Sequence, residues 1–407
     1  MEANTVKRAG YGPAARLADT LLRGPRALGA FELTPGAINA AADRISGHRD
    51  ALPSEVAEPL ELLCADLAEN PPSALGAAIL RTLLVQGLVS RRRLQHVDSR
   101  VGLQPTRPPF VLVGWYRTGT TFLQQLLDAV PGYGFVPMHR MLEPIPRRGT
   151  RAKAEIGTRL AGLLSPELAV AHPVTAMGPE ECWALLLTHL VVEGLAFHWT
   201  MPRFEGWLRR VDRRPAYRGW ARATAGLEAD RGTALVLKDP AHLMGLDALV
   251  EALPDAQLIW THRDPVAAVA SYGSVTALQH RNVTGHLAPE RAGRVCLDRL
   301  DLSLRQGFEF AARLRPGQLV HLSYSDLVAD PVEVVRSLCA HFGVRFDADA
   351  MALRAAQLRE PRQVHRYKLE SWGLERSQVE TRLHHYSPTW WAKGTGVRST
   401  TPESTPS

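Results

Sequence analysis

The sequence has few cysteines, and their positions exclude two common kinds of site. The chain of 407 residues contains four of them, with no CxxC pair and no Cys/His spacing typical of metal ligands; they are Cys64, Cys182, Cys296 and Cys339. Neither a zinc site nor a disulfide framework is indicated. We therefore expect a protein of the reducing cytoplasm.

A long uninterrupted apolar run is also missing. The first ten residues lack the apolar core of a signal peptide, and the two most apolar runs, Ala74–Ser90 and Ala184–Phe197, contain Arg81, His189 and Glu193. We interpret both runs as buried helices and expect no membrane span.

Lysine is rare, so arginine carries nearly all the positive charge. The formal net charge is +7, and the sequence has only five lysines. A basic chain favours anionic ligands. The run Arg91–Arg93 has no interleaved aromatic residues, so it indicates a solvated helix end and no nucleic-acid partner.

The length allows one large α/β domain with an additional helical region. We predict a helical N-terminal layer over residues 1–104 and an α/β domain over 105–397. A helical insertion is expected at about 151–229. Residues 398–407 are polar and rich in Pro, Ser and Thr, which predicts a disordered tail.

Residues 110–127 predict a phosphate-binding turn between a strand and a helix. Four apolar residues indicate a buried strand, residues 114–121 a turn of small side chains, and residues 122–129 a helix. Such a turn directs backbone N–H groups and the helix dipole at one point, which suits a phosphate or sulfate. The spacing is that of a nucleoside-triphosphate loop, but Thr120 stands in the lysine position and the charge is on Arg117. Either the turn is an accident of composition, or its ligand is phosphorylated and is not a triphosphate.

Two further predicted strands end in cations. Residues 234–237 are followed by Lys238, and residues 257–261 by His262 and Arg263. Ligands of open α/β sheets lie at the carboxyl ends of strands, so we expect these cations and Arg117 on one binding edge. Asp264 and Pro265 are expected to begin a helix, with Ser271 on its second turn.

The predicted insertion contains acids and aromatics with two possible roles. Glu180 and Glu181 follow Gly178–Pro179, and we expect this pair to lie in the first turn of a helix; an acidic site residue is the alternative. Five aromatic residues either line an apolar acceptor pocket or pack between helices; they are Trp183, Trp199, Trp207, Tyr217 and Trp220.

Five segments occur in an order shared with a known family. They are Arg117–Thr121, Leu237–His242, the segment Pro254–Ser271, Tyr324–Leu327 with Asp330–Pro331, and His365–Tyr367 with Trp372–Leu374 and Tyr386. In this order they resemble the sulfotransferases that use 3′-phosphoadenosine-5′-phosphosulfate (PAPS). The branch they resemble most is the bacterial one related to tyrosylprotein sulfotransferases, over roughly residues 110–390.

This resemblance implies a P-loop-like parallel sheet flanked by helices, and it implies residue roles. The 5′-phosphosulfate would be held by Arg117, Thr118, Gly119, Thr120 and Thr121. Arg263 and Ser271 would bind the 3′-phosphate, and Tyr324 would lie beside the nucleotide. Arg117 and Lys238 would stabilise charge on the leaving group, 3′-phosphoadenosine-5′-phosphate (PAP), each contributing about 2–4 kcal/mol if they act as oxyanion-hole donors do. No metal is required.

The general base departs from the family pattern. Relatives place a glutamate about twenty residues after the loop arginine, and this position reads His139–Arg140 here. Arginine cannot act as a base at neutral pH. We expect His139 to replace the glutamate, with Glu143 as the next candidate and His242 as the third.

The predicted enzyme transfers a sulfuryl group from PAPS to a hydroxyl of a small or lipidic acceptor. One alternative is a P-loop kinase-like enzyme, which the missing lysine after Gly119 disfavours. The other is a non-catalytic nucleotide-binding protein in which the missing glutamate reflects lost chemistry. The acceptor and the oligomeric state do not follow from the sequence.

Overall fold

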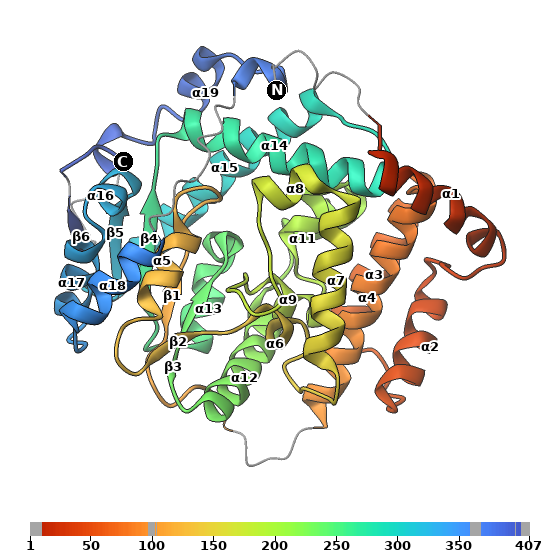
Figure 1. Cartoon of the computed structure of the whole chain (residues 1–407), viewed down its shortest axis with the longest axis horizontal. Helices are drawn as coiled ribbons and strands as arrows, with labels where there is room; N and C mark the ends of the chain where they lie inside the picture. Colours follow the sequence, from red (N-terminus) through yellow and green to blue (C-terminus); the bar gives the residue numbers. More distant parts are fainter. Residues whose placement is uncertain (1–9, 97–101, 103, 359–367, 395, 400–407) are drawn as a thin grey trace.

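The computed structural model describes residues 10–96, 102, 104–358, 368–394 and 396–399. It contains a six-stranded sheet, which lies on the left in Figure 1, with the N-terminal helices on the right. The strand order is β2-β3-β1-β4-β5-β6; β6 runs antiparallel to β5 and all other neighbours are parallel. The strands are β1 (Phe110–Leu112), β2 (Tyr133–Phe135), β3 (Ala234–Lys238), β4 (Gln257–His262), β5 (Leu319–Ser323) and β6 (Val397–Ser399). The predicted parallel α/β sheet flanked by helices is confirmed.

Strand β1 lies between β3 and β4, and this position assembles the binding edge. Leu112 pairs with Lys238 of β3 on one side and with Ile259 of β4 on the other. The chain segments that follow β1, β3 and β4 therefore leave the sheet side by side. The order also reverses at β1, since β2 and β3 lie on one side of it and β4 and β5 on the other, and such a reversal favours ligand binding.

Alternate strand residues face two separate apolar layers, as the pleat requires. Val111 and Leu237 pack into the larger core, which the helical insertion shares. Leu112 and Val236 face the smaller core beneath α5, α17 and α18. The helices of this second layer are α5 (Thr120–Leu127), α16 (Tyr324–Ala329), α17 (Pro331–His341) and α18 (Ala348–Leu358).

The N-terminal layer is built of four helices in the described residues. It consists of α1 (Pro13–Ala27), α2 (Pro35–Ser46), α3 (Ser54–Glu69) and α4 (Ala74–Gln95). Among the described residues, α4 alone is long and apolar enough to cross a membrane, and 67% of its most apolar window is buried inside the protein. Such burial is typical of a core helix.

The insertion between β2 and β3 is helical and slightly longer than predicted. Its helices are α6 (Met138–Leu142), α7 (Thr150–Leu164), α8 (Pro166–Ala171), α9 (Trp183–Leu186), α10 (Glu193–His198), α11 (Pro202–Leu208) and α12 (Arg214–Arg231). The run Ala184–Phe197 is not one buried helix, because Leu190 adopts a left-handed conformation (φ 58°) and separates α9 from α10.

Most aromatic residues of the insertion are core residues. Trp199, Trp207, Tyr217 and Trp220 are buried and belong to the larger core, and only Trp183 is partly exposed at its edge. Packing between helices, the second of the two roles considered, therefore accounts for these four.

The rest of the chain is helical except at its end. It contains α13 (Leu246–Ala252), α14 (Pro265–Thr284), α15 (Pro289–Ala311) and α19 (Arg376–Arg382). The predicted start of α14 is confirmed: Asp264 accepts a hydrogen bond from the N–H of Val266. The predicted disordered tail is wrong at its start, because residues 398 and 399 continue β6, whose backbone pairs with β5. The other residues of that tail, 400–407, lie outside the described part of the chain, as does the motif His365–Tyr367.

Candidate active site

The turn after β1 is held tightly against the neighbouring strand. A Cβ atom on Gly114 would lie 1.9 Å from the Thr261 hydroxyl, so only glycine fits there. Thr118 donates to the Trp115 carbonyl (2.6 Å), and its hydroxyl lies 2.7 Å from that of Thr261. Helix α5 begins at Thr120, and the first N–H groups of a helix have no partner within it. The turn thus presents a fixed set of backbone donors.

Arg117 and Gly119 both adopt left-handed backbone conformations, with φ values of 66° and 88°. Such a conformation costs a residue with a Cβ about 1–2 kcal/mol, so Arg117 is strained. Strain of this kind is concentrated at functional sites. At Gly119 a Cβ would lie 2.7 Å from the Tyr324 ring.

The turn, α14 and α16 bring four predicted site residues together. The Arg117 Nε donates to the Ser271 hydroxyl (3.1 Å). Arg263 donates to the Arg117 carbonyl (2.8 Å), and its guanidinium lies 4.5 Å from the centre of the Tyr324 ring. The site therefore brings two guanidinium groups, a hydroxyl and an aromatic ring next to one another.

Lys238 ends β3 next to the same turn. Its Nζ donates to the Thr121 hydroxyl (3.0 Å) and to a Glu181 carboxylate oxygen (3.2 Å). The lysine side chain is only 2% exposed and that of Glu181 14%. An ammonium buried to this extent requires a partner, and Glu181 supplies the opposite charge.

The prediction that Glu181 lies in the first turn of a helix is wrong. Its neighbour Glu180 behaves as a local capping group and accepts from the N–H of Glu181 (2.9 Å) and from the Trp183 indole (3.4 Å). Glu181 instead faces the site, since the N–H of Cys182 donates to the Lys238 carbonyl (2.8 Å) and fixes this segment against β3. Both glutamates precede α9, which begins only at Trp183.

The charge of Glu181 affects the groups around it. Burial, and next the Glu181 charge, raise the pKa of Asp239 well above its usual range. Tyr116 and Tyr272 stack 4.0 Å apart, and burial is the main cause that raises the pKa of both phenols well above the usual value. Both phenols therefore stay neutral at neutral pH.

The three base candidates named from the sequence make other contacts. Glu143 accepts from Thr150 (2.7 Å) and Lys153 (2.8 Å); burial opposes ionisation, but these hydrogen bonds lower its pKa. His139 lies on a surface groove of about 540 Å³, with its Nδ1 2.9 Å from the Ala176 carbonyl. His242 is fully buried beside the Tyr217 hydroxyl (2.8 Å), and burial lowers its pKa to about 3. None of the contacts described for these three residues reaches Arg117 or Lys238.

The donor set fits a nucleotide that carries a phosphate and a phosphosulfate. It combines three cations, threonine and serine hydroxyls and backbone N–H groups, which together favour two separate anionic groups. The Tyr324 ring beside Arg263 supplies an apolar face. Among the described residues no group of three His, Cys, Asp or Glu side chains is arranged to hold a metal ion.

The chain is similar in sequence to known sulfotransferases. The sequence profile of the sulfotransferase family matches residues 108–348. Omega-hydroxy-beta-dihydromenaquinone-9 sulfotransferase Stf3 of Mycobacterium tuberculosis, and that of Mycobacterium bovis, are each 25% identical over 253 residues, 58% of this chain and 63% of the relative. The matched region thus spans less than two thirds of the length of these curated relatives.

Two solved structures are similar over most of the chain. Sulfotransferase STF1 from Mycobacterium tuberculosis H37Rv is 26% identical, with a TM-score of 0.71 over 86% of this chain and 98% of that one. Sulfotransferase STF9 from Mycobacterium avium is 21% identical, with a TM-score of 0.75 over 89% and 98%, a likeness that shows the fold.

Proposed function

Because the chain belongs to the sulfotransferase family, we propose that it transfers a sulfuryl group from PAPS to the hydroxyl of a small or lipidic acceptor. The observation that carries the proposal is the contact of Lys238 with both the phosphate-binding turn and Glu181. One side chain thereby joins a site for an anionic donor to a carboxylate that can accept a proton.

On the donor side, the chain supplies cations at two positions. Arg263 and Ser271 would hold a 3′-phosphate, and Tyr324 would lie beside the nucleotide. Arg117, the N–H groups of residues 118–121 and Lys238 would hold the phosphosulfate. When bound, PAPS supplies an activated sulfuryl group with PAP as its leaving group. Arg117 and Lys238 would stabilise the charge on the departing oxygen, an effect of about 2–4 kcal/mol per donor in comparable sites.

On the acceptor side, we propose Glu181 as the general base in place of His139 and Glu143. Its carboxylate is the only acid that contacts Lys238 among the described residues, whereas Glu143 is occupied by Thr150 and Lys153. Glu181 would take the proton from the acceptor hydroxyl while Lys238 keeps the carboxylate oriented.

The acceptor class is supported by the relatives and by the groups near Glu181. The name of the mycobacterial relatives gives a hydroxylated menaquinone derivative, a lipid, as what those proteins act on. In this chain, the stacked rings of Tyr116 and Tyr272 lie near Glu181 and offer aromatic surface. We therefore favour a lipidic alcohol.

Calorimetry and a turnover assay test the proposal. PAP should bind in the absence of magnesium, and ATP should bind more weakly. No binding of PAP at high protein concentration would refute the proposed donor, and preferential binding of ATP with Mg²⁺ would support the kinase-like alternative. Labelled PAPS should then transfer its sulfuryl group to a lipidic alcohol, giving a sulfate ester and PAP, or slowly to water, giving sulfate and PAP. Binding without any turnover by the unaltered protein would favour the non-catalytic alternative.

A further inference from the structure

Exposed large hydrophobic side chains are concentrated in one part of the molecule. Eleven such side chains occur among the described residues, and eight of them lie on α1, α7, α8 and the segments that directly follow α1 and α8. They are Leu17, Leu21, Leu28, Ile156, Leu160, Leu163, Val170 and Met177. Single exposed leucines are ordinary on a protein surface, but a gathering of this size marks an interaction site.

In α1 and in α7 these side chains form a row along one helix face. Leu17 and Leu21 are four residues apart in α1, and Leu28 is the residue directly after that helix. In α7, Ile156, Leu160 and Leu163 have spacings of four and three. Both helices are therefore amphipathic, with the apolar row turned toward solvent.

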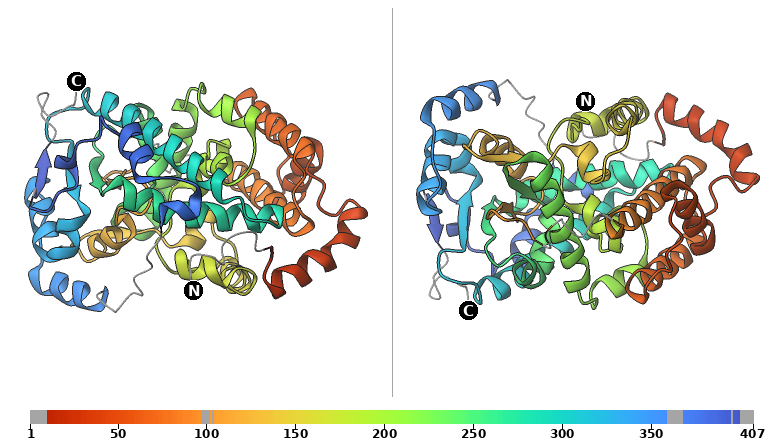
Figure 2. Two further views of the ribbon diagram at one scale, coloured as in Figure 1. Left: turned by 90° about the horizontal axis from the view of Figure 1, so that it is seen from above. Right: turned by 90° about the horizontal axis from the view of Figure 1, so that it is seen from below.

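The two helices that carry the rows are neighbours. Leu164 at the end of α7 packs against the small core that Tyr11 and Ala15 form beneath α1. Both views of Figure 2 show α1 (red) and α7 with α8 (yellow) on the same side of the molecule. We call the eight exposed side chains and their helices the α1/α7 face.

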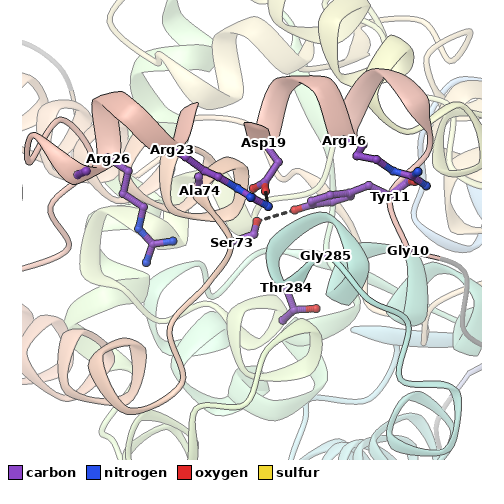
Figure 3. Close-up of a pocket in the computed structure, with 11 residues that line it drawn as sticks. Gly10, Tyr11, Arg16, Asp19, Arg23, Arg26, Ser73, Ala74, Thr284 and Gly285 are labelled. Carbon is purple, nitrogen blue, oxygen red and sulfur yellow. Dashed lines mark hydrogen bonds and ion pairs between the residues drawn. The ribbon is translucent and has the colours of Figure 1, made fainter. Parts of the chain in front are cut away.

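A groove lined by arginines accompanies the apolar row of α1. Its volume is about 790 Å³, and Arg16, Arg23 and Arg26 line it from α1 (Figure 3). Opposite them lie Ser73, at the start of α4, and Gly285, at the end of α14. On the helix, these arginines lie roughly 100–180° around the axis from Leu17, at the helical period of 100° per residue.

The charge on the α1/α7 face is predominantly positive. Helices α1, α7 and α8 carry six basic side chains and three acidic ones; the basic ones are Arg16, Arg23, Arg26, Arg151, Lys153 and Arg159. Three of these bases pair with acids, Arg23 with Asp19, Arg151 with Glu155 and Lys153 with Glu143, whereas Glu167 pairs with Arg281 of α14.

We propose that the α1/α7 face docks on a membrane surface containing anionic phospholipid. Its apolar rows would enter the boundary between headgroups and acyl chains, and the basic side chains of these helices would meet the lipid phosphates. Helices that lie in a membrane interface combine these features, since they carry an apolar row on one side and basic side chains on the other. On α7, Lys153 and Arg159 lie on either side of the apolar row at the helical period, whereas on α1 the arginines lie on the far side of the helix from its row.

One member of the face is also close to the proposed acceptor site along the chain. Met177, its last member, is four residues before Glu181. The backbone between them is fixed, because Pro137 pairs with Pro179 and the Gly178 carbonyl accepts from Met138. Docking would thus bring Glu181 close to a source of lipidic alcohol, a consequence that rests on the proposed function; the docking itself does not.

Vesicle co-sedimentation of the full chain tests the docking. Protein should sediment with vesicles of phosphatidylglycerol and phosphatidylcholine, and at least about tenfold less with phosphatidylcholine alone, because several basic side chains contribute. Leu17→Gln with Leu21→Gln, and separately Leu160→Gln with Leu163→Gln, should each lower the partition coefficient about tenfold. The matched control is Leu353→Gln with Val328→Gln, since these two side chains are 63% and 52% exposed on other helices.

Three results would overturn the proposal. One is an absence of sedimentation of the unaltered protein with anionic vesicles; another is an equal loss in the control. The third is a dimer in solution that the row variants convert to monomer, because a second copy would then cover the face. PAP binding, measured on the same variants, should be unchanged and reports separately on the proposed function.

A labelling experiment locates the contact. The four native cysteines are buried, so a polarity-sensitive dye should react selectively with Leu160→Cys or, as a control, with Leu353→Cys. Anionic vesicles should shift the emission of the first to shorter wavelength and leave the second unchanged. Equal shifts at both positions, or a shift at the control alone, would contradict docking through this face.

Discussion

The donor side and the acceptor side of the site are built in different ways. On the donor side, the cations lie at or after the carboxyl ends of parallel strands, so the order of the sheet alone brings them together; they are Arg117, Lys238 and Arg263. On the acceptor side, Glu181 belongs to no strand or helix and reaches the site from the insertion, where backbone contacts with Lys238 and Met138 fix its segment. The strand order of the sheet therefore fixes the donor side, whereas local packing of the insertion fixes the acceptor side.

Lys238→Ala should have the largest effect, because this residue belongs to both sides. Turnover should fall about a thousandfold, the upper range for loss of one donor to a developing oxyanion. The substitution also leaves the Glu181 carboxylate without its cation. Steady-state rates and PAP calorimetry on the same preparation measure the two effects.

Lys153→Ala is the matched control for that change. Lys153 also pairs with a glutamate, Glu143, but is 65% exposed and lies in α7. Its removal should leave turnover within about twofold, since an exposed ion pair contributes little. Equal losses in the two lysine variants would mean that the site does not lie at the end of β3.

Glu181→Gln should have the next largest effect. It should impair the acceptor side of the site and leave the donor side intact. Loss of a general base typically costs about a hundredfold or more in rate. PAP affinity should not weaken, because the donor contacts of Arg117, Arg263 and Ser271 are intact. Single-turnover rates with a saturating acceptor, set beside PAP affinity, provide the measurement.

The controls for Glu181→Gln are the same substitution at two other base candidates, Glu143→Gln and His139→Gln. Both are expected to retain turnover, and Glu143→Gln should mainly lower the free energy of unfolding because it weakens the contacts with Thr150 and Lys153. If His139→Gln lost a hundredfold while Glu181→Gln did not, the base would be the histidine predicted from the sequence.

These differences explain how far the sequence could predict the structure. Strand ends are visible as short apolar runs, so Lys238 and Arg263 could be assigned to one edge before the sheet was known. The role of Glu181 depends on the bond from Cys182 to the Lys238 carbonyl, a contact between residues 56 positions apart that has no periodic pattern. Likewise β6 depends on pairing with β5, and its composition resembles that of a disordered tail.

Acid should destabilise the core on the acceptor side. Burial, followed by the charge of Arg91, lowers the pKa of His189 to about 3, and burial does the same for His242. Both values lie below that of an unfolded histidine, so the unfolded state binds more protons between about pH 6.5 and pH 3, and stability is lost as pH falls through this window. Each histidine contributes up to about 1.4 kcal/mol per pH unit there. Denaturant unfolding at pH 7 and at pH 5 should show this fall, and a constant free energy would contradict it.

Gly119→Ala should damage the donor side in two ways. A left-handed alanine costs about 1–2 kcal/mol, and its Cβ would displace the Tyr324 ring. Gly343→Ala, also at positive φ (65°) but with no neighbour near its Cβ, reports the strain alone. Both variants should lose stability in thermal melts, and only Gly119→Ala should lose PAP affinity; equal PAP affinity would mean that Tyr324 does not lie beside the nucleotide.

Ser271→Ala should have the smallest effect and is the finest test of the donor side. The hydroxyl accepts from Arg117 and is proposed to bind the 3′-phosphate, so its loss should weaken PAP binding by about 1 kcal/mol, or roughly fivefold. Ser274→Ala is the control, since this hydroxyl lies one turn later in α14 and donates to the Ser271 carbonyl (2.7 Å). Adenosine 5′-phosphosulfate, which lacks the 3′-phosphate, should bind equally to the unaltered protein and to Ser271→Ala. A fivefold loss for that ligand as well would show that Ser271 acts only by positioning Arg117, and the 3′-phosphate would then depend on Arg263 alone.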